Sequence, residues 1–338
     1  MAGGTQIAVL GAGSVGCFVG GCWQSAGLPV TFIGRPKLSR DVDAHGLVLS
    51  DYSGWRATLR PGEIDYRCGP EALAEADIIV LAVKSGATAE AAAQIAEHGH
   101  DGATIISLQN GISNIDVLGQ GLGGCFEVAR GMVPFNVAYL GEGRFHKGVA
   151  GSLWADRRSV TQSLSEQIGG GPAALKLSDD MLALAWGKLL INLNNAVNAL
   201  SGKTLRDELR HRDYRRVFAA SMREGLDLLQ RAGIEPAKVG AVAPTLLPYV
   251  VAAPDWLFNN VFGRSWKIDA KARSSMADDL AAGRKTEVEY LNGELVRLAE
   301  RLNADAPVNR AIVDLVHQAE AGAKPLSPAA LRRAALGR

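Results

Sequence analysis

The glycine pattern near the start of the chain constrains the fold more than any other feature. Gly11, Gly13 and Gly16 form G-x-G-x-x-G. An apolar run at residues 6–10 precedes them and predicts a buried strand, while residues 14–25 predict a helix. In this context the first glycine allows a tight turn, the second lets a pyrophosphate approach the backbone, and the third lets helix and strand pack closely. The alternative is a glycine-rich turn without a ligand.

The predicted dinucleotide site places phosphates on the N-terminus of that helix. Its residues are Gly11, Ala12, Gly13, Ser14, Val15 and Gly16.

Strand-like and helix-like segments alternate over residues 1 to about 175. Further short apolar runs lie at residues 28–33, 76–83 and 103–108, and residues 87–98 form a helical pattern. Such alternation predicts a doubly wound, Rossmann-like parallel sheet with helices on both faces. Ligands bind at the carboxyl ends of the strands in sheets of this kind.

The pattern changes at about Ser178, where a Ser-Asp-Asp sequence is a candidate helix N-cap. Beyond it, amphipathic helices are predicted over residues 179–201, 213–232, 274–303 and 309–321. We therefore expect an α/β nucleotide-binding domain over residues 1–177 and an all-α substrate domain over residues 178–338, with the active site between them.

Composition limits the possible partners. The 338 residues carry a formal net charge of +1, so no basic field exists to attract nucleic acid or an anionic membrane. The longest apolar stretch, residues 239–254, is interrupted by Pro244 and Pro248 and predicts no membrane span. Four cysteines without metal-ligand spacing and a first strand close to the N-terminus lead us to expect a cytoplasmic protein without a signal peptide.

The residue after the second predicted strand indicates the cofactor. NAD-binding domains usually carry an acidic residue there for the ribose 2′-hydroxyl, whereas this chain has Gly34-Arg35-Pro36-Lys37. An arginine can stack on adenine and bind a 2′-phosphate through a charge-assisted fork. NADPH/NADP+ is therefore the predicted cofactor. If Arg35 and Lys37 are only solvated loop residues, the preference stays open.

Two polar stripes in the predicted helical domain suggest chemistry. Lys188, Asn192 and Asn195 recur at i, i+4 and i+7 within an otherwise apolar sequence, so they share one helical face. The alternative is that this face is simply the solvent-exposed side of the helix. A lysine ammonium could protonate a carbonyl oxygen during hydride addition and stabilise its developing charge.

Ser275, Asp279 and Glu287 form the second stripe, with spacings of four and eight residues that we place on one helix. A carboxylate there could accept a hydrogen bond from the product hydroxyl and orient the lysine. The alternative for Glu287 is an exposed ion pair with Arg284 or Lys285.

Over essentially its full length the chain resembles the ketopantoate reductase (2-dehydropantoate 2-reductase) family. The matching motifs are GAGSVG at 11–16, Arg35, Val83-Lys84, Leu108-Gln109-Asn110-Gly111, Lys188 with Asn192, SSMADD at 274–279, GRKTEVEYLNG at 283–293 and Pro307-Val308-Asn309.

The resemblance implies NADPH-dependent reduction of a small 2-oxo acid, namely ketopantoate to pantoate in pantothenate and coenzyme A biosynthesis, by a possible homodimer. It implies that Lys188 is the general acid and that Glu287 binds the substrate hydroxyl beside the cofactor. Asn110 and Ser275 would hold the substrate carboxylate, Lys84 would lie by the cofactor and the substrate, and Asn110 would also lie by the cofactor. Asn192 and Asn195 would contact the substrate, and Asp279 would support the neighbouring groups.

Two departures bear on the substrate. The family often has asparagines where this chain has Ala196 and, shortly before the SSM sequence, Ala272-Arg273. The aromatic and basic segment 252–272 could instead supply Asn259, Asn260, Arg264 or Lys267 to the pocket. A reductase of a different 2-oxo acid therefore stays open, as does a non-catalytic NADPH-binding regulator. His98 and His100 lack carboxylates at metal-binding spacing, so we expect no metal site.

Overall fold

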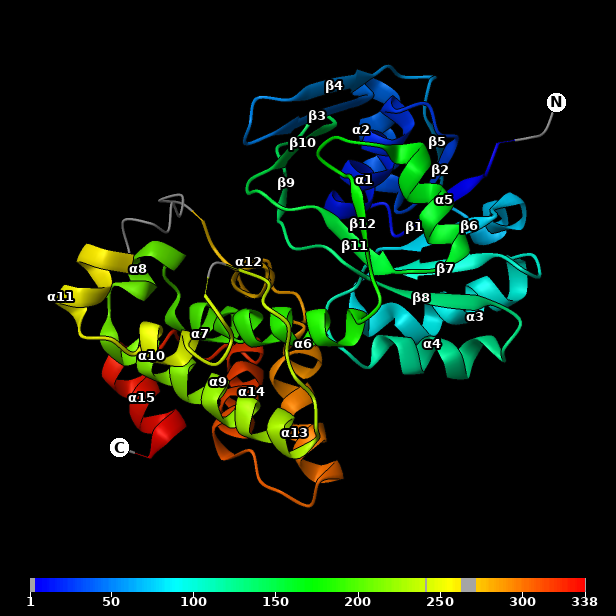
Figure 1. The fold of residues 1–338 in the computed structure, drawn as a ribbon. Coiled ribbons are helices and arrows are strands. Elements are labelled where there is room, and N and C mark those ends of the chain that lie inside the picture. Colours follow the sequence, from blue (N-terminus) through cyan, green and yellow to red (C-terminus); the bar gives the residue numbers. More distant parts are fainter. Residues whose placement is uncertain (1–3, 241, 263–271, 338) are drawn as a thin grey trace. The chain divides into compact units, whose positions relative to one another are not determined.

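The computed structural model describes residues 4–240, 242–262 and 272–337. Backbone contacts divide the chain into two compact units, residues 1–181 and 182–338 (Figure 1). The sequence places the domain boundary between residues 177 and 178. Two of the candidate pocket residues, Arg264 and Lys267, lie outside the described residues.

The first unit is built on an eight-stranded sheet of order β12-β11-β8-β7-β6-β1-β2-β5 (Figure 1). The six neighbouring strands β8, β7, β6, β1, β2 and β5 run parallel, and β11 is antiparallel to β8. Their bounds are β1 Ile7–Leu10, β2 Val30–Ile33, β5 Asp65–Arg67, β6 Ile78–Leu81, β7 Thr104–Ser107, β8 Glu127–Met132, β11 Leu153–Asp156 and β12 Leu175–Ser178. The predicted Rossmann-like sheet is confirmed.

Alternate residues of β1 supply the two cores on either face of this sheet. Ile7 and Val9 pack with α1 (Ser14–Ser25) and α5 (Ser159–Ile168). Ala8 and Leu10 pack with the other face, covered by η1 (Pro70–Glu75), α3 (Thr88–His98) and α4 (Asn114–Leu122). Because helices cover both faces, the strands are apolar on both sides.

A second, four-stranded sheet of order β4-β3-β10-β9 was not predicted. Its strands are β3 Leu47–Asp51, β4 Arg56–Leu59, β9 Val137–Tyr139 and β10 Arg144–Lys147. It packs on α1, which therefore lies between two sheets: a Cβ on Gly20 would lie 2.6 Å from the Phe32 ring, and one on Gly21 would lie 2.9 Å from Leu49 Cδ1. The glycines of α1 thus provide the space that lets both sheets approach it.

The second unit is helical among its described residues. Its α-helices are α6 Met181–Asn192, α7 Asn194–Ser201, α8 Leu205–Leu209, α9 Arg212–Arg231, α10 Leu247–Val251, α11 Asp255–Leu257, α12 Ser275–Ala281, α13 Asn292–Arg301, α14 Pro307–Glu320 and α15 Pro328–Leu336. A π-helical turn, η3 (Phe258–Phe262), and a 3-10 turn, η4 (Val288–Tyr290), lie between them. The long helix α9 packs against α7, α10, α13, α14 and α15. Among the described helices none combines the length and apolar character needed to cross a bilayer.

The prediction of a single helix over residues 274–303 is wrong. Gly283, at φ +63°, ends α12: its N–H donates to the Leu280 carbonyl at 3.0 Å, and the Arg284 N–H donates to the Asp279 carbonyl at 2.8 Å. These paired bonds, with glycine in the left-handed conformation, form a Schellman motif. Glu287 therefore lies on the connection after α12 and does not share a helical face with Asp279.

The helix expected over residues 179–201 is divided at Leu193 into α6 and α7. Ser178 is the last residue of β12 and does not cap α6. Its hydroxyl accepts the N–H of Asp180 at 3.1 Å, which is too early to satisfy the first turn of a helix that begins at Met181.

Candidate active site

The glycine turn joins β1 to α1, and two of its three glycines are required by the backbone there. Gly11 has φ +95°, and a Cβ there would lie 2.5 Å from the Val83 backbone nitrogen. A Cβ on Gly16 would lie 2.6 Å from the Gly11 carbonyl oxygen. Gly11 and Gly16 are therefore required by the fold itself, because any side chain there would collide with the backbone.

Gly13 differs, because a Cβ there would meet nothing nearer than 4.0 Å. It is the N-cap of α1, whose first turn carries no acidic residue. The first intrahelical bond runs from the Cys17 N–H to the Gly13 carbonyl, so the amides of Ser14, Val15 and Gly16 precede it. This open, amide-rich helix N-terminus fits a pyrophosphate, and the residues present are therefore compatible with a dinucleotide cofactor.

Arg35 follows β2 and Gly34, and it is the exposed N-cap of α2 (Pro36–His45). Within the described residues its guanidinium forms no ion pair with an acidic side chain. The charge of Arg35 acts on Tyr66, whose hydroxyl donates to the Ala12 carbonyl at 3.0 Å. Arg35 is thus a cation near the glycine turn, as binding of a 2′-phosphate requires.

A buried polar network fixes the loops that follow β6 and β7. The Thr88 hydroxyl donates to Asn114 Oδ1 at 2.8 Å, and Gln109 Nε2 donates to the Thr88 hydroxyl at 2.8 Å. The Ser85 hydroxyl donates to the Asn110 carbonyl at 3.0 Å, which joins the two loops. Lys84, at the exposed start of η2 (Ser85–Ala87), and the half-buried Asn110 are therefore brought together at the carboxyl edge of the sheet.

Lys188 is half-buried on α6 among buried neighbours such as Trp186 and Leu189. Burial lowers the pKa of Lys188 to about 8, and the carboxylate of Glu287 opposes that shift. Although Glu287 is not on a helix, the structure brings it into electrostatic contact with Lys188, as the carbonyl chemistry requires. A lysine of this pKa can exchange its proton near neutral pH.

The remaining predicted residues lie on α6, α7 and α12. Asn192 is the half-buried last residue of α6, and Asn195 is half-buried on α7. The hydroxyl of Ser274, the N-cap of α12, donates to the Asn195 carbonyl at 3.0 Å. The exposed Ser275 is the next residue in the chain and therefore lies next to this contact. Asp279 is buried and pairs with Arg284 at 2.9 Å, which supports the turn after α12.

A buried carboxyl group that none of the sequence motifs contains supports the α7–α12 contact. Glu208 accepts hydrogen bonds from Asn194 at 3.0 Å and from Asn198 at 3.4 Å, and Asn198 Oδ1 accepts the Ser274 N–H at 2.9 Å. Burial raises the pKa of Glu208 to about 8, although both amides and Arg215 lower it. The spacing of Asn194 and Asn198 was the available signal, since residues four apart share a helical face.

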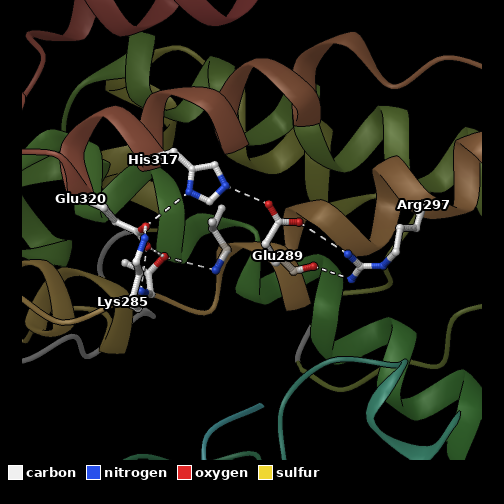
Figure 2. A network of polar contacts seen from close by, with 7 residues as sticks. Lys285, Glu289, Arg297, His317 and Glu320 are labelled. Carbon is white, nitrogen blue, oxygen red and sulfur yellow. Dashed lines mark hydrogen bonds and ion pairs between the residues drawn. The ribbon is translucent and has the colours of Figure 1, made fainter. Parts of the chain in front are cut away.

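A second ionic network surrounds the Glu287 connection (Figure 2). Glu320 and His317 on α14 lie next to Lys285 and Glu289, and Arg297 on α13 approaches Glu289 from the other side (Figure 2). Lys285 is 35 residues from Glu320 and Glu289 is 28 residues from His317, and no local pattern indicates these two contacts.

Comparisons with known proteins identify the family of this chain. Residues 7–158 match the family model described as ketopantoate reductase PanE/ApbA, and residues 180–320 match the model of its C-terminal part. The chain belongs to the ketopantoate reductase family. It is therefore an oxidoreductase acting on a CH–OH/C=O couple, in a family whose members use a pyridine nucleotide.

Curated relatives of the family match along nearly the whole chain. The 2-dehydropantoate 2-reductase of Archaeoglobus fulgidus is 28% identical over 94% of this chain and 98% of that protein. The corresponding enzyme of Halobacterium salinarum is 29% identical over 93% of this chain and 99% of that protein.

Solved structures share the fold. A PanE/ApbA family ketopantoate reductase from Ralstonia eutropha has a TM-score of 0.79 and 27% identity, covering 94% of this chain and 99% of that one. A D-mandelate dehydrogenase, solved with NADH and anilino(oxo)acetate, has a TM-score of 0.77 at 18% identity, with coverage of 94% and 99%.

Proposed function

We propose that this chain catalyses the NADPH-dependent reduction of 2-dehydropantoate (ketopantoate) to pantoate, with Lys188 as the general acid. The observation that carries the proposal is the pairing of the half-buried Lys188, whose pKa is about 8, with the carboxylate of Glu287 in a chain of this family. The proposed place of the reaction is the cytoplasm, and the product would supply pantothenate and coenzyme A biosynthesis.

Lys188 and Glu287 act on the carbonyl oxygen in this proposal. When the C2 carbon gains hydride, the oxygen takes up the proton from Lys188 Nζ, which leaves a neutral amine and a C2 hydroxyl. Glu287 accepts a hydrogen bond from that hydroxyl, and its charge keeps Lys188 protonated before the step. General acid catalysis of this kind typically contributes about 10² to 10⁴ in rate.

The substrate carboxylate is assigned to Asn110 and Ser275, and the rest of the substrate to Asn192 and Asn195. Support for this assignment comes from two contacts: the network around Ser85 that fixes Asn110, and the Ser274–Asn195 bond that places Ser275 next to α7. Asp279, through its pair with Arg284, keeps the connection to Glu287 in place.

The cofactor is assigned to the glycine turn of residues 11–16, to Arg35, and to Lys84 with Asn110, with Glu287 beside its reactive end. When bound, NADPH supplies the hydride. The amides of the first turn of α1 would hold the pyrophosphate, and Arg35 would hold the 2′-phosphate that distinguishes NADPH from NADH. We further propose a homodimer, since one similar structure, from Staphylococcus aureus, is described as a dimeric ketopantoate reductase.

A second candidate is a reductase of another 2-oxo acid. Ala196, where the family often has an asparagine, is fully buried, and the Ala272 carbonyl accepts the Leu205 N–H at 2.8 Å. Neither side chain can bond to a substrate hydroxyl. The D-mandelate dehydrogenase with the same fold acts on a different 2-hydroxy acid, which gives this candidate a precedent.

A substrate panel separates the two candidates. NADPH oxidation would be measured with ketopantoate, 2-oxoisovalerate, pyruvate and other branched 2-oxo acids. Ketopantoate should give the highest kcat/KM, by about 10² or less over 2-oxoisovalerate, because an apolar pocket discriminates weakly. A higher kcat/KM for another acid would favour the second candidate, and cofactor binding without any turnover would favour a regulator.

A further inference from the structure

Glu320, the last residue of α14, binds the segment that carries Glu287. Its Oε1 accepts both the backbone N–H and the hydroxyl of Thr286, each at 2.8 Å. Its Oε2 accepts Lys285 Nζ at 3.3 Å and lies 3.3 Å from His317 Nδ1. The Glu320 side chain is only 7% exposed, whereas that of Lys285 is 89% exposed. The two hydrogen bonds from Thr286 are therefore better shielded from solvent than the contact with Lys285.

The Glu320 carboxylate is held ionised by these partners. Burial on its own would raise the pKa of Glu320, but the hydrogen bonds from Thr286, His317 and Lys285 outweigh it and keep the pKa below its ordinary value. Hydrogen bonds to an ionised acceptor are shorter and stronger than those between neutral groups. One buried charge thus fixes both the backbone and the side chain of Thr286.

The connection needs such an anchor, because α12 ends at Ala281 and η4 begins only at Val288. Thr286 immediately precedes Glu287, and its hydroxyl accepts the Val288 N–H at 3.3 Å. On the far side of Glu287, Glu289 bonds to His317 Nε2 at 2.8 Å and pairs with Arg297 at 3.5 Å (Figure 2). The residues on both sides of Glu287 are thus tied to α14.

We propose that Glu320 is a positioning residue that, through Thr286, holds Glu287 beside Lys188. Glu320 thereby keeps Lys188 protonated and ready to deliver its proton in the reaction. This inference rests on the proposed function for its catalytic consequence. Its structural content is independent of substrate: releasing Thr286 lets Glu287 move away from Lys188, so the ammonium loses the charge that favours it.

Glu320→Gln tests the anchor, and Glu300→Gln is its matched control. Glu300 on α13 pairs with Arg310 on α14 at 3.5 Å, but both side chains are about half exposed. The readout is the pH at which Lys188 becomes reactive toward acetic anhydride, followed by mass spectrometry. We expect the midpoint to fall by about 0.5 pH unit or more in Glu320→Gln and to stay unchanged in Glu300→Gln.

Thr286→Val and Thr286→Ser keep the test decisive if Glu320→Gln does not fold. Valine removes the hydroxyl donor and should shift the Lys188 midpoint in the same direction, whereas serine restores the donor and the wild-type midpoint. A purely structural role would lower the melting temperature without moving the midpoint, and that result would overturn the inference. A shifted midpoint in a protein that reduces no 2-oxo acid would support the inference and count against the proposed function.

Discussion

Lys188 and Glu287 are 99 residues apart in the sequence, yet the Glu287 carboxylate opposes the burial that lowers the pKa of Lys188 to about 8. A buried lysine without a carboxylate would lose its proton more readily. The pairing thus preserves an acid that stays protonated at neutral pH and still gives up its proton during turnover.

Replacing Lys188 by alanine should lower kcat by about 10² to 10⁴, because the carbonyl oxygen loses its proton donor. NADPH affinity should stay within about twofold, since Lys188 is not assigned to the nucleotide. Steady-state kinetics and fluorescence titration measure the two effects, with Lys324→Ala as an exposed-lysine control. If Lys188→Ala keeps most of its kcat, the proton donor is another group, and Lys84 is the next candidate.

The pH dependence follows from the pKa of Lys188. The acid is active when protonated, so kcat/KM should be level at neutral pH and fall above pH of about 8, approaching about tenfold per pH unit. In Glu287→Gln the descending limb should move to lower pH, because a charge that favours the ammonium is gone. An unchanged limb would show that Lys188 does not carry the titrating proton.

Gly11 and Gly13 should respond to alanine in different ways. At Gly11, φ +95° and contact with the Val83 backbone should make alanine destabilising by about 2 kcal/mol or more. At Gly13, where a Cβ meets nothing nearer than 4.0 Å, alanine should cost less, about 1 kcal/mol, because alanine is a poorer N-cap residue than glycine. Gly13→Ala should nonetheless weaken NADPH binding at least about tenfold, about 1.4 kcal/mol. Thermal unfolding measures the stability changes, and titration measures NADPH affinity. Normal NADPH binding by Gly13→Ala would contradict the role given to the first turn of α1.

Arg35 should set the choice of nucleotide. The wild-type protein should bind NADPH at least about tenfold more tightly than NADH, and Arg35→Ala should remove that difference by weakening NADPH binding more than NADH binding. Arg40→Ala, an exposed arginine on α2, is the matched control. Equal affinities for the two nucleotides in the wild-type protein would refute the role given to Arg35.

The sequence predicts the parts of this protein that depend on local pattern. The β1–turn–α1 unit follows from three glycines between an apolar run and a helix, and the strands at residues 78–81 and 104–107 follow from short apolar runs. The end of α12 was predictable in principle, since Gly283 is a typical C-terminal glycine, but the continuing helical pattern concealed it.

Other features depend on contacts between distant residues. The second sheet pairs β3 with β10, which are separated by almost 100 residues, and its strands are partly exposed, so they lack the fully buried apolar pattern of β1, β6 and β7. The bond between Thr286 and Glu320 spans 34 residues and joins a loop to a helix end. No periodicity reports such a contact, so the support of Glu287 becomes visible only in the folded chain.

Reduction of ketopantoate with NADPH labelled with deuterium at the transferred C4 position tests whether hydride passes from the nucleotide to C2 of this substrate. The product would be analysed by mass spectrometry and NMR. The wild-type protein should form pantoate that carries one deuterium at C2, and Lys188→Ala should form it much more slowly. Absence of turnover with ketopantoate, or a product without deuterium at C2, would contradict it.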